Sequence, residues 1–452
     1  MGKEFLYKMF GRKSRAGKQI LLFTIMTSVV VLVGLVVMTV YAGHLQRGAK
    51  EQKPEVQYEA LGSHAAQPTV PLPDMTAARE PVEEPSVEEP SVEEPSVEEQ
   101  LASANEALYS AALEQGQNVR LVECADTESV TFAFAGDILL DDSYAIMSTY
   151  RLRGSNMEDT FSPGLLERMR GADVFMLNNE FTFTTRGTPT EDKQYTFRAK
   201  PENVEFLHQL GVDIVSLANN HAYDYGEVSL LDTMETLKNA DIPYVGAGHN
   251  LEEAMKPTYI IANGMKIAIV SGTQIERNGS PDTKGATENS PGVLRCMKPD
   301  NLLAVIKEAE ENSDFTILYI HWGTEGQEGT DWLQEEQAPL YAEAGVDLII
   351  GDHSHCLQRL DVVSGVPVIY SMGNYWFNSR TMNTCLVEIS IKDGALEGFQ
   401  FIPCRQSNCR TTMLEGAEKE EVLGYMRSIS PNVEIDSEGN VDFGIAKIDA
   451  QN

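Results

Sequence analysis

Basic residues are scarce in this chain. Among its 452 residues, 35 are Lys or Arg and 68 are Asp or Glu, which gives a net charge of −33 at pH 7. Because nucleic-acid binding needs a basic face that neutralises phosphates, this composition argues against nucleic acid as a partner. It also argues against tight attraction of the main domain to anionic lipid headgroups. A polyanionic substrate would need local Lys, Arg or metal charge to hold it.

Cysteines are also few, and no two of them form a Cys-x-x-Cys pair, so we do not expect a thiolate zinc centre. An even number permits disulfides without requiring them, and Cys404 and Cys409 are close enough in sequence to close a loop. Cys356 follows a histidine pair, and we interpret it as a small buried residue. The cysteines are Cys124, Cys296, Cys356, Cys385, Cys404 and Cys409.

The first 42 residues differ from the rest of the chain. Residues 1–18 contain six basic side chains and one acidic one. The uncharged apolar run over 20–42 meets the roughly 18–20 residues that a membrane helix needs. A cleaved signal peptide is the competing interpretation, but its apolar core is usually about 7–15 residues long. We expect a basic cytoplasmic tail over 1–18, a single-pass cell-membrane anchor over 19–42, and an extracellular remainder.

Residues 43–128 form an acidic, Pro- and Glu-rich segment. Its centre repeats Val-Glu-Glu-Pro-Ser over residues 82–96, and this composition offers too little apolar surface to offset the entropy of ordering. We expect a disordered, extended linker, either a stalk or a neutral connection, with a short helix over 101–115. The folded domain is predicted over 129–411. A C-terminal extension over 412–452 contains a further helix at 417–427.

Apolar runs alternate with helix-like stretches from residue 130 onward. Runs that are apolar throughout are typical of strands buried on both faces, and their alternation with helices indicates an α/β domain with much parallel pairing. Residues 386–402 alternate apolar and polar side chains, which predicts antiparallel strands. The apolar runs lie at 130–135, 174–177, 214–217, 267–270, 315–320, 348–350 and 366–370.

Polar side chains follow several of these runs, and the carboxyl ends of strands are where open α/β sheets place their ligands. The most informative are His353 and His355, which can reach one point from the same side. With two carboxylates, an amide and a third histidine they make an N/O set suited to Zn, Mn or Fe, large enough for one or two ions. The predicted metal ligands are Asp137, Glu180, Asn220, His321, His353 and His355.

Further residues at these strand ends are candidates for catalysis or substrate binding. His221 is placed to face a substrate, where it could donate a proton or stabilise an anionic transition state. Asp224 could orient His221 or cap the helix that begins nearby. The aromatic residues after Asn374 either floor a pocket or pack in the core. The candidate substrate contacts are Asn179, Asn219, Trp322 and Asn374.

In this order the clusters resemble the bacterial capsule-synthesis CapA family, which is associated with poly-γ-glutamate capsules. The resemblance covers roughly residues 130–401. The matching pieces are Gly136-Asp137, Asn179-Glu180, Ala218-Asn219-Asn220-His221 with Asp224 and Gly226, His321-Trp322-Gly323, Gly351-Asp352-His353-Ser354-His355 with Gln358, and Ser371-Met372-Gly373-Asn374.

The resemblance implies a calcineurin-like metallophosphatase fold, a four-layer α-β-β-α sandwich with a two-metal site on strand-end loops. It makes the six predicted ligands the metal ligands and His221 the proton donor. Two departures stand out. Metallophosphatases usually open with Asp-x-His, whereas Asp137 is followed by Ile138 and Leu139, so one ligand of the first metal is missing. Glu180 stands where the bridging residue is usually Asp.

Three functions from different classes fit these observations. The first is a membrane-anchored extracellular protein of capsule or poly-γ-glutamate assembly or export, with a metal-dependent hydrolase- or amide-transferase-like site. The second is a non-catalytic component that binds polymer, favoured by the missing histidine and the family's association with export. The third, a metal-dependent phosphodiesterase or phosphatase, follows from fold analogy alone. Expected partners are an anionic envelope polymer such as poly-γ-glutamate, other capsule-synthesis membrane proteins and the membrane, and no nucleic acid.

Overall fold

The computed structural model describes residues 96–276 and 283–445. The basic tail, the membrane anchor and the Val-Glu-Glu-Pro-Ser repeats expected from the sequence lie outside these ranges, except for the last serine of the repeats. Among the helices that the structure describes, none is long and apolar enough to span a membrane. The membrane anchor and the disordered linker therefore stay predictions.

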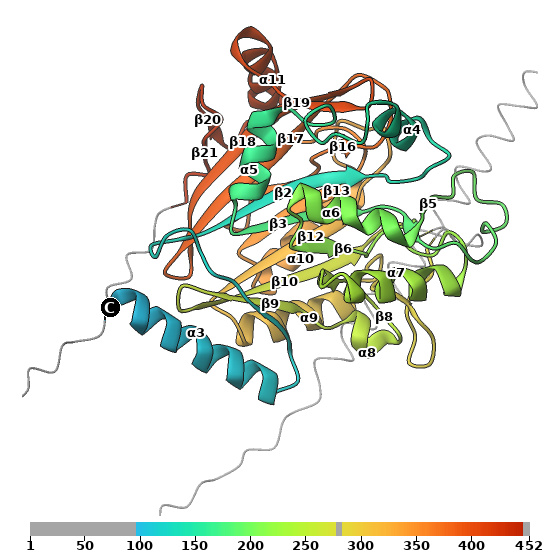
Figure 1. Ribbon diagram of the computed structural model, residues 1–452. Coiled ribbons are helices and arrows are strands. Elements are labelled where there is room, and N and C mark those ends of the chain that lie inside the picture. The colour runs from blue at the N-terminus through green and yellow to red at the C-terminus, as the bar shows by residue number, and fades with distance from the viewer. Residues whose placement is uncertain (1–95, 277–282, 446–452) are drawn as a thin grey trace, which may run out of the picture. The chain divides into compact units, whose positions relative to one another are not determined.

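An eight-stranded sheet forms one half of the domain (Figure 1). Its centre is parallel, with β2 (Val130–Ile138), β3 (Val174–Asn179) and β6 (Ile214–Ser216) side by side. Antiparallel strands extend it, as the alternation over 386–402 predicts. The remaining members are β17 (Met382–Lys392), β18 (Ala395–Ser407), β19 (Arg410–Met413), β7 (Tyr244–Val245), and β16 (Asn374–Trp376), which pairs with β2.

A seven-stranded sheet forms the other half. Four of its strands are mutually parallel, namely β10 (Met265–Thr273), β12 (Phe315–Trp322), β13 (Leu348–His353) and β15 (Val366–Ile369). Each coincides with an apolar run of the sequence, which confirms the predicted α/β pattern. The edges are built from β1 (Asn118–Leu121), β9 (Thr258–Ala262) and β14 (Leu360–Val363).

The two sheets pack face to face, and helices cover their outer faces. Phe134 of β2 and Tyr319 of β12 meet between the sheets, with ring centroids 6.4 Å apart. Fully burying a side chain of this size contributes roughly 1.5–3 kcal/mol. The eight-stranded sheet is covered by α4 (Ala145–Leu152), α5 (Pro163–Gly171), α6 (Glu205–Leu210) and α7 (Glu227–Asn239), and the seven-stranded sheet by α9 (Asp300–Glu311) and α10 (Trp332–Glu343). The predicted α-β-β-α sandwich is therefore present.

The folded unit extends beyond the predicted bounds of 129 and 411. β1 pairs in parallel with β9, and Asn105 of α3 (Val97–Glu114) accepts a hydrogen bond from the Gly264 amide at 2.7 Å. At the other end, Leu423 of α11 (Gly416–Ile429) belongs to the core between the sheets. The sequence places α3 in the linker because this helix lacks a clear apolar stripe; Ala112 is its one buried residue.

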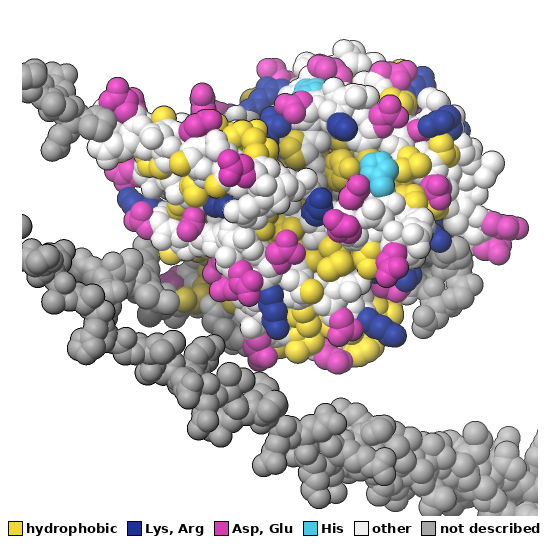
Figure 2. Space-filling model, turned by 90° about the horizontal axis from the view of Figure 1, so that it is seen from below, with side chains coloured by type: hydrophobic (Ala, Val, Ile, Leu, Met, Phe, Trp, Pro, Cys, Tyr) yellow, Lys and Arg dark blue, Asp and Glu magenta, His cyan; other side chains and the backbone are white. Residues whose placement is uncertain are grey.

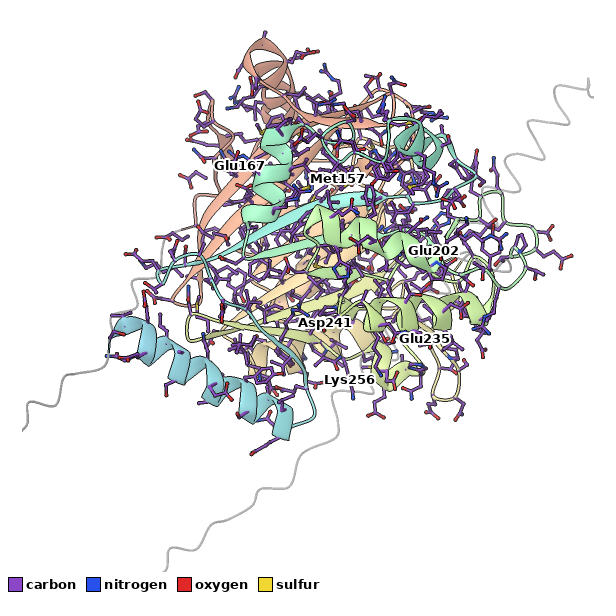
Figure 3. The ribbon with its side chains drawn as sticks, in the orientation of Figure 1. Met157, Glu167, Glu202, Glu235, Asp241 and Lys256 are labelled. Carbon is purple, nitrogen blue, oxygen red and sulfur yellow. The ribbon has the colours of Figure 1, made fainter. Side chains whose placement is uncertain are left out.

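Short paired segments complete the described residues. They are β4 (Thr182–Phe183) with β5 (Arg198–Ala199), β8 (Ala247–Gly248) with β11 (Gly292–Val293), β20 (Glu434–Ile435) with β21 (Val441–Asp442), the 3-10 turn Pro201–Val204 and the helix α8 (Leu251–Ala254). The covering helices turn charged residues such as Glu167 and Glu235 toward solvent (Figure 3). Acidic and basic side chains are interspersed over the face in Figure 2. All six cysteines are free, so the possible Cys404–Cys409 bridge does not form.

Candidate metal centre

All six predicted metal ligands converge at one edge of the sandwich, where parallel strands of both sheets end. The eight-stranded sheet provides Asp137 in β2, Glu180 directly after β3 and Asn220 after β6. The other sheet provides His321 in β12, His353 in β13 and His355 just after it. Potential donor atoms form three overlapping groups, each within 4.8 Å: Glu180, His321 and His353; Asp137, His321 and Asp352; and Asp137, Glu180 and His355.

A close backbone approach next to Asp137 explains the glycine that precedes it. The Asp137 amide donates a hydrogen bond to the Gly373 carbonyl at 3.3 Å, and Asn374 of β16 pairs with Asp137. A Cβ on Gly136 would lie 2.1 Å from the Gly373 carbonyl oxygen. Only glycine allows this approach, which brings the loop of Asn374 to the candidate centre.

His321 is oriented through both of its ring nitrogens. Its Nδ1 lies 2.8 Å from Asp352 Oδ1, while its Nε2 lies 2.8 Å from Asn220 Oδ1 and 2.9 Å from His353 Nδ1. A carboxylate beside Nδ1 favours the tautomer with the proton on Nδ1, as in histidines that bind metals. The lone pair on Nε2 then faces the carbonyl oxygen of Asn220. With its proton on Nδ1, His321 has no hydrogen on Nε2, and Asn220 Oδ1 is also an acceptor, so no hydrogen bond joins these two atoms.

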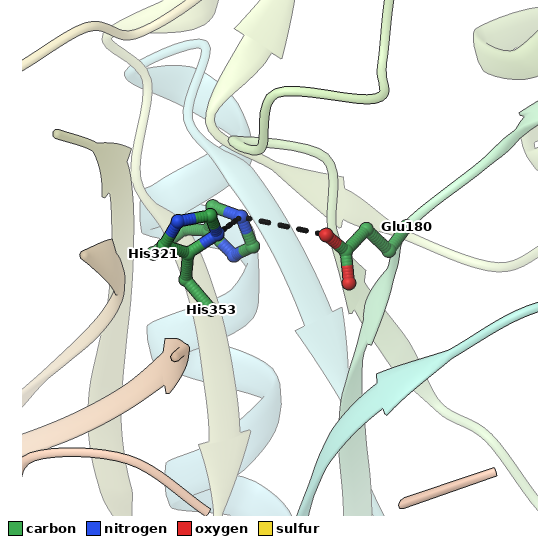
Figure 4. Close-up of side chains that lie close together, drawn as sticks. All are labelled: Glu180, His321 and His353. Carbon is green, nitrogen blue, oxygen red and sulfur yellow. Dashed lines mark hydrogen bonds and ion pairs between the residues drawn. The ribbon is translucent and has the colours of Figure 1, made fainter. Parts of the chain in front are cut away.

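Glu180 is fully buried, and neither of its carboxylate oxygens has a hydrogen-bond partner among the described residues. Its Oε1 lies 3.7 Å from His321 Nε2 (Figure 4). Burial, with the charges of Asp137 and Asp352, raises the pKa of Glu180 well above its usual value. A buried carboxylate without a partner is costly unless a cation compensates it. This orphaned group, among imidazole nitrogens and an amide oxygen, fits a divalent transition metal ion.

The imidazoles beside Glu180 are in the form that metal ligation needs. Burial is the main reason that the pKa of His321 falls to about 3 and that of His353 falls well below its usual value. Both rings are therefore neutral at pH 7 and present lone pairs. Metal ligands must be unprotonated in the same way.

The Asp137 side of the centre is held together differently. The Oδ2 atom of Asp137 lies 2.9 Å from His355 Nδ1, and the Oδ1 atom of Asp137 accepts a hydrogen bond from Asn178 Nδ2 at 2.8 Å. Burial alone would raise the pKa of Asp137, but the His355 interaction lowers it below its usual value. Leu139, at the position where the resemblance leads one to expect a histidine, is 1% exposed and packs in the apolar core.

Backbone strain marks the histidine pair. His353 has a φ of +88° and His355 a φ of +58°, a region that residues other than glycine adopt rarely. Each such residue costs of order 1–3 kcal/mol and persists only where the surroundings impose it. His353 ends β13 and His355 follows on the loop, so the strain lies where the chain brings both rings to the cluster.

His221 lies beside the cluster, and Asp224 orients its ring. Its Nδ1 is 2.7 Å from Asp224 Oδ2, and Asp224 Oδ1 accepts a hydrogen bond from Lys193 Nζ at 2.6 Å. This contact favours a proton on Nδ1, which leaves the Nε2 lone pair 3.9 Å from Glu180 Oε1. Burial lowers the pKa of His221. The N-cap of α7 is Gly226, so Asp224 does not cap this helix. Its contact with His221 instead fits the predicted role of orienting that ring.

Three polar residues of the centre were not predicted. Asp352 contacts His321, Asn178 contacts Asp137, and Lys193 contacts Asp224. Asp352 and Asn178 directly precede predicted site residues in the chain, so their position was the available signal. Lys193 lies 31 residues before Asp224, and no local pattern marks it.

Two of the four predicted substrate contacts have other roles. Trp322 is fully buried beneath α10, where its indole N–H donates to the Tyr370 carbonyl at 2.8 Å. It does not reach the centre because neighbouring strand residues point to opposite faces and His321 takes the inner one. The side-chain amide of Asn219 already forms hydrogen bonds within the protein. Its Nδ2 donates to Asn178 Oδ1 and to the Asn179 carbonyl, and its Oδ1 accepts from the His221 N–H.

The other two, Asn179 and Asn374, are nearly or fully buried in the same region. The Oδ1 atom of each lacks a hydrogen-bond partner among the described residues. The Nδ2 of Asn179 donates to the Phe181 carbonyl at 2.8 Å. Both therefore stay candidate contacts.

The family model of the bacterial capsule synthesis protein PGA_cap matches residues 131–379. The chain belongs to this family. The matched region contains every predicted metal ligand as well as His221 and Asp224, and it agrees with the extent of the resemblance in the sequence.

Curated relatives support the same assignment. Capsule biosynthesis protein CapA of Bacillus anthracis is 34% identical over 219 residues, covering 47% of this chain and 52% of that protein. PGA biosynthesis protein CapA of Bacillus subtilis is 32% identical over 216 residues, covering 47% and 56%. A probable polyglutamine synthesis accessory protein of Mycobacterium tuberculosis is 27% identical over 275 residues, covering 57% and 72%. The matched part of this chain spans about half the length of the two Bacillus proteins.

Proposed function

We propose that this chain acts in capsule or poly-γ-glutamate biosynthesis through a metal-dependent, hydrolase- or transferase-like centre of the metallophosphatase type. Family membership and the names of the Bacillus relatives support the capsule role. The single observation that carries the metal centre is the buried Glu180 carboxylate, which has no hydrogen-bond partner among the described residues and faces His321 Nε2 at 3.7 Å. The four-layer sandwich is consistent with a metallophosphatase-like domain.

Two overlapping ligand sets would hold the metal. Glu180, Asn220, His321 and His353 form the first set, and Asp137, Glu180 and His355 form the second. These nitrogen and oxygen donors suit Zn, Mn or Fe. A divalent ion bound there would supply Lewis-acid polarisation of a carbonyl or phosphoryl oxygen.

His221 provides the acid–base chemistry in this proposal. Asp224 holds its Nδ1–H, so Nε2 can take a proton from an attacking nucleophile. The imidazolium that forms is stabilised by Asp224 and can return the proton to the leaving group. Lys193 and the Phe197 amide hold Asp224 in place at 2.6 Å each. A group positioned in this way typically contributes about 10²–10⁴-fold to a rate.

The metal content of the purified full chain tests this proposal. Mass spectrometry of the parent should find about one to two transition-metal ions per chain, as two-metal sites of this kind allow. His353→Ala should lose most of this metal because it removes one of the donors that face Glu180. His208→Ala is the matched control, since His208 is an exposed histidine of α6. Equal metal content in His353→Ala and the parent would sink the proposal.

A non-catalytic, polymer-binding component is the second candidate, and Leu139 favours it. A side chain packed in the core provides no ligand for the Asp137 side, so the centre could hold a metal that serves structure alone. Complementation of a capsule-deficient strain with His221→Ala separates the candidates. Full capsule production by this variant, while His353→Ala fails, would exclude acid–base chemistry by His221. Loss of capsule with normal protein and metal levels would support it.

We also propose that residues 19–42 anchor the chain in the cell membrane with the sandwich outside. The basic tail and the long apolar run in the sequence support this. Protease added to intact cells should degrade the sandwich while leaving cytoplasmic proteins whole. Protection of the sandwich in intact cells, with cleavage only after lysis, would contradict it.

A further inference from the structure

The loop between β4 and β5, residues 184–197, lies against the segment after β6 that carries a predicted ligand and the proposed acid–base residue. The Thr190 amide of this loop donates a hydrogen bond to the Asp224 carbonyl at 2.8 Å. A Cβ on Gly187 would lie 2.1 Å from the Tyr225 carbonyl oxygen, so the two backbones approach as closely as glycine allows. The loop therefore packs directly on this segment.

Lys193 extends from this loop into the protein, and its side chain is 6% exposed. Its Nζ donates hydrogen bonds to Asp224 Oδ1 at 2.6 Å and to the carbonyl oxygen of Asn220. Asp224 in turn orients His221, while the side-chain Oδ1 of Asn220 lies 2.8 Å from His321 Nε2. One ammonium group thus contacts both the carboxylate that orients the acid–base histidine and the backbone of a predicted metal ligand.

Both polar groups of the peptide between Asn220 and His221 are held. Lys193 binds its carbonyl, and its N–H donates to Asn219 Oδ1 at 2.9 Å. Because a peptide is planar, a rotation of this unit would break both hydrogen bonds and turn the two side chains that flank it. One of these side chains is a predicted metal ligand, and the other is the proposed acid–base residue. The position of this peptide therefore sets the position of both.

Charge compensation of Asp224 does not by itself account for these contacts. Asp224 is fully buried, and a buried carboxylate needs a partner of opposite charge. The bond from Lys193 to Asp224 meets that need, whereas the second bond, to the Asn220 carbonyl, joins an uncharged group. A cation beside a metal centre also repels the metal ion, so attraction to the centre does not explain Lys193 either.

We propose that Lys193 is a positioning residue, which keeps the ligand Asn220 and the acid–base residue His221 in fixed relative positions. It does so by holding the peptide between them and the carboxylate of Asp224. The inference rests on the proposed function and adds to it a cation from a loop that is remote in sequence. Lys193 acts through Asp224 and this peptide, not through contact with the reacting groups.

Zn²⁺ affinity of the full chain, measured by titration with a competing chelator, tests the inference. Lys193→Met should weaken Zn²⁺ binding by about tenfold, the usual scale for removing a group that holds a ligand. Charge alone predicts the opposite sign, because the loss of a nearby cation favours binding of another. Lys193→Arg keeps the charge and the donors, so it should recover part of the affinity. Lys392→Met removes the same charge at the far end of the eight-stranded sheet and should leave the affinity within about twofold of the parent.

A double variant separates positioning from charge compensation. Lys193→Met combined with Asp224→Asn removes the buried ion pair as a unit, so the fold should be retained. If Lys193 only compensated Asp224, this variant would bind Zn²⁺ as tightly as the parent. The inference predicts binding that is still about tenfold weaker, because the Asn220 carbonyl has lost its donor. Parent-like affinity in the double variant, or tighter binding in Lys193→Met, would overturn the inference.

The His221 ring gives a second readout that needs no metal. In nuclear magnetic resonance spectra of the chelated full chain with isotope-labelled histidine, its Nδ1 proton should give a resonance that is missing in His221→Gln. The contact with Asp224 protects this proton from exchange with water. Lys193→Met should weaken the resonance severalfold, and Lys193→Arg should keep part of it. An unchanged resonance in Lys193→Met would contradict the inference.

The Zn²⁺ content of the parent separates this inference from the proposed function. A parent that binds no metal contradicts the proposed function, whereas the His221 resonance still tests the role of Lys193. A parent that binds metal, with Lys193→Met unchanged in both readouts, contradicts the inference alone.

Discussion

The two sides of the candidate centre differ in how completely the chain supplies them. On the His353 side, neither carboxylate oxygen of Glu180 has a hydrogen-bond partner among the described residues, and His321 Nε2 faces Asn220 Oδ1 at 2.8 Å. On the Asp137 side, His355 and Asn178 already satisfy the carboxylate, and Leu139 packs in the core. We therefore infer that a bound cation would stabilise the first side more than the second. We expect the His353 side to bind metal more tightly.

The largest effect is expected at Glu180, which both sides share. Glu180→Gln should abolish metal binding, because it removes the carboxylate that faces His321 Nε2. In the metal-free protein the same change should raise the free energy of unfolding, by about 1–3 kcal/mol, because a buried charge is removed and the new amide N–H faces the acceptor His321 Nε2. Calorimetry with and without chelator measures both. A loss of stability in the chelated variant would contradict this account of the His353 side.

Asp352→Asn should weaken metal binding by about 10–100-fold, the usual effect of removing a carboxylate that holds a ligating histidine. The asparagine can still accept a hydrogen bond from His321 Nδ1, so the fold should be retained. Titration with a competing chelator gives the affinity. An unchanged affinity would mean that His321 does not serve the metal through Nε2.

His355→Ala should cost less affinity for the first ion than Asp352→Asn does, because His355 belongs to the Asp137 side. The expected loss is severalfold or less, and it should fall mainly on a second, weaker ion. The same chelator titration checks this. If His355→Ala removed the tightly bound ion, the ranking of the two sides would be reversed.

Trp322→Phe should have the smallest effect on the centre. It removes the hydrogen bond to the Tyr370 carbonyl and some buried surface, which should lower the free energy of unfolding by about 1–3 kcal/mol. Metal content should not change, because the indole packs beneath α10. Denaturant unfolding and metal analysis of this variant test the placement of Trp322, and lost metal would contradict it.

Much of the sandwich and most of the centre could be predicted from the sequence. Strands such as β12 and β13 are apolar throughout, which is a strong local signal, and parallel strands bring their carboxyl ends to one edge. His321 and His353 were placed at this edge for this reason, and the structure brings them together there. α3 was assigned to the linker because its buried face is too small to give an apolar stripe.

The residues that orient the ligands were harder to predict. Asp352 and Lys193 act through contacts between segments that are distant in sequence, and such pairing depends on the tertiary fold. Trp322 was predicted to contact substrate because it follows His321 in the motif, although adjacent side chains of a strand point to opposite faces of the sheet. The strained backbone of His353 and His355 leaves no trace in the residue types.

Anomalous diffraction from crystals of the metal-loaded full chain tests the central claim most directly. Data at the absorption edge of the bound metal should show a peak surrounded by Glu180, Asn220, His321 and His353. Any second peak, near Asp137 and His355, should be weaker. No peak within ligand distance of Glu180 and His321 would contradict the account.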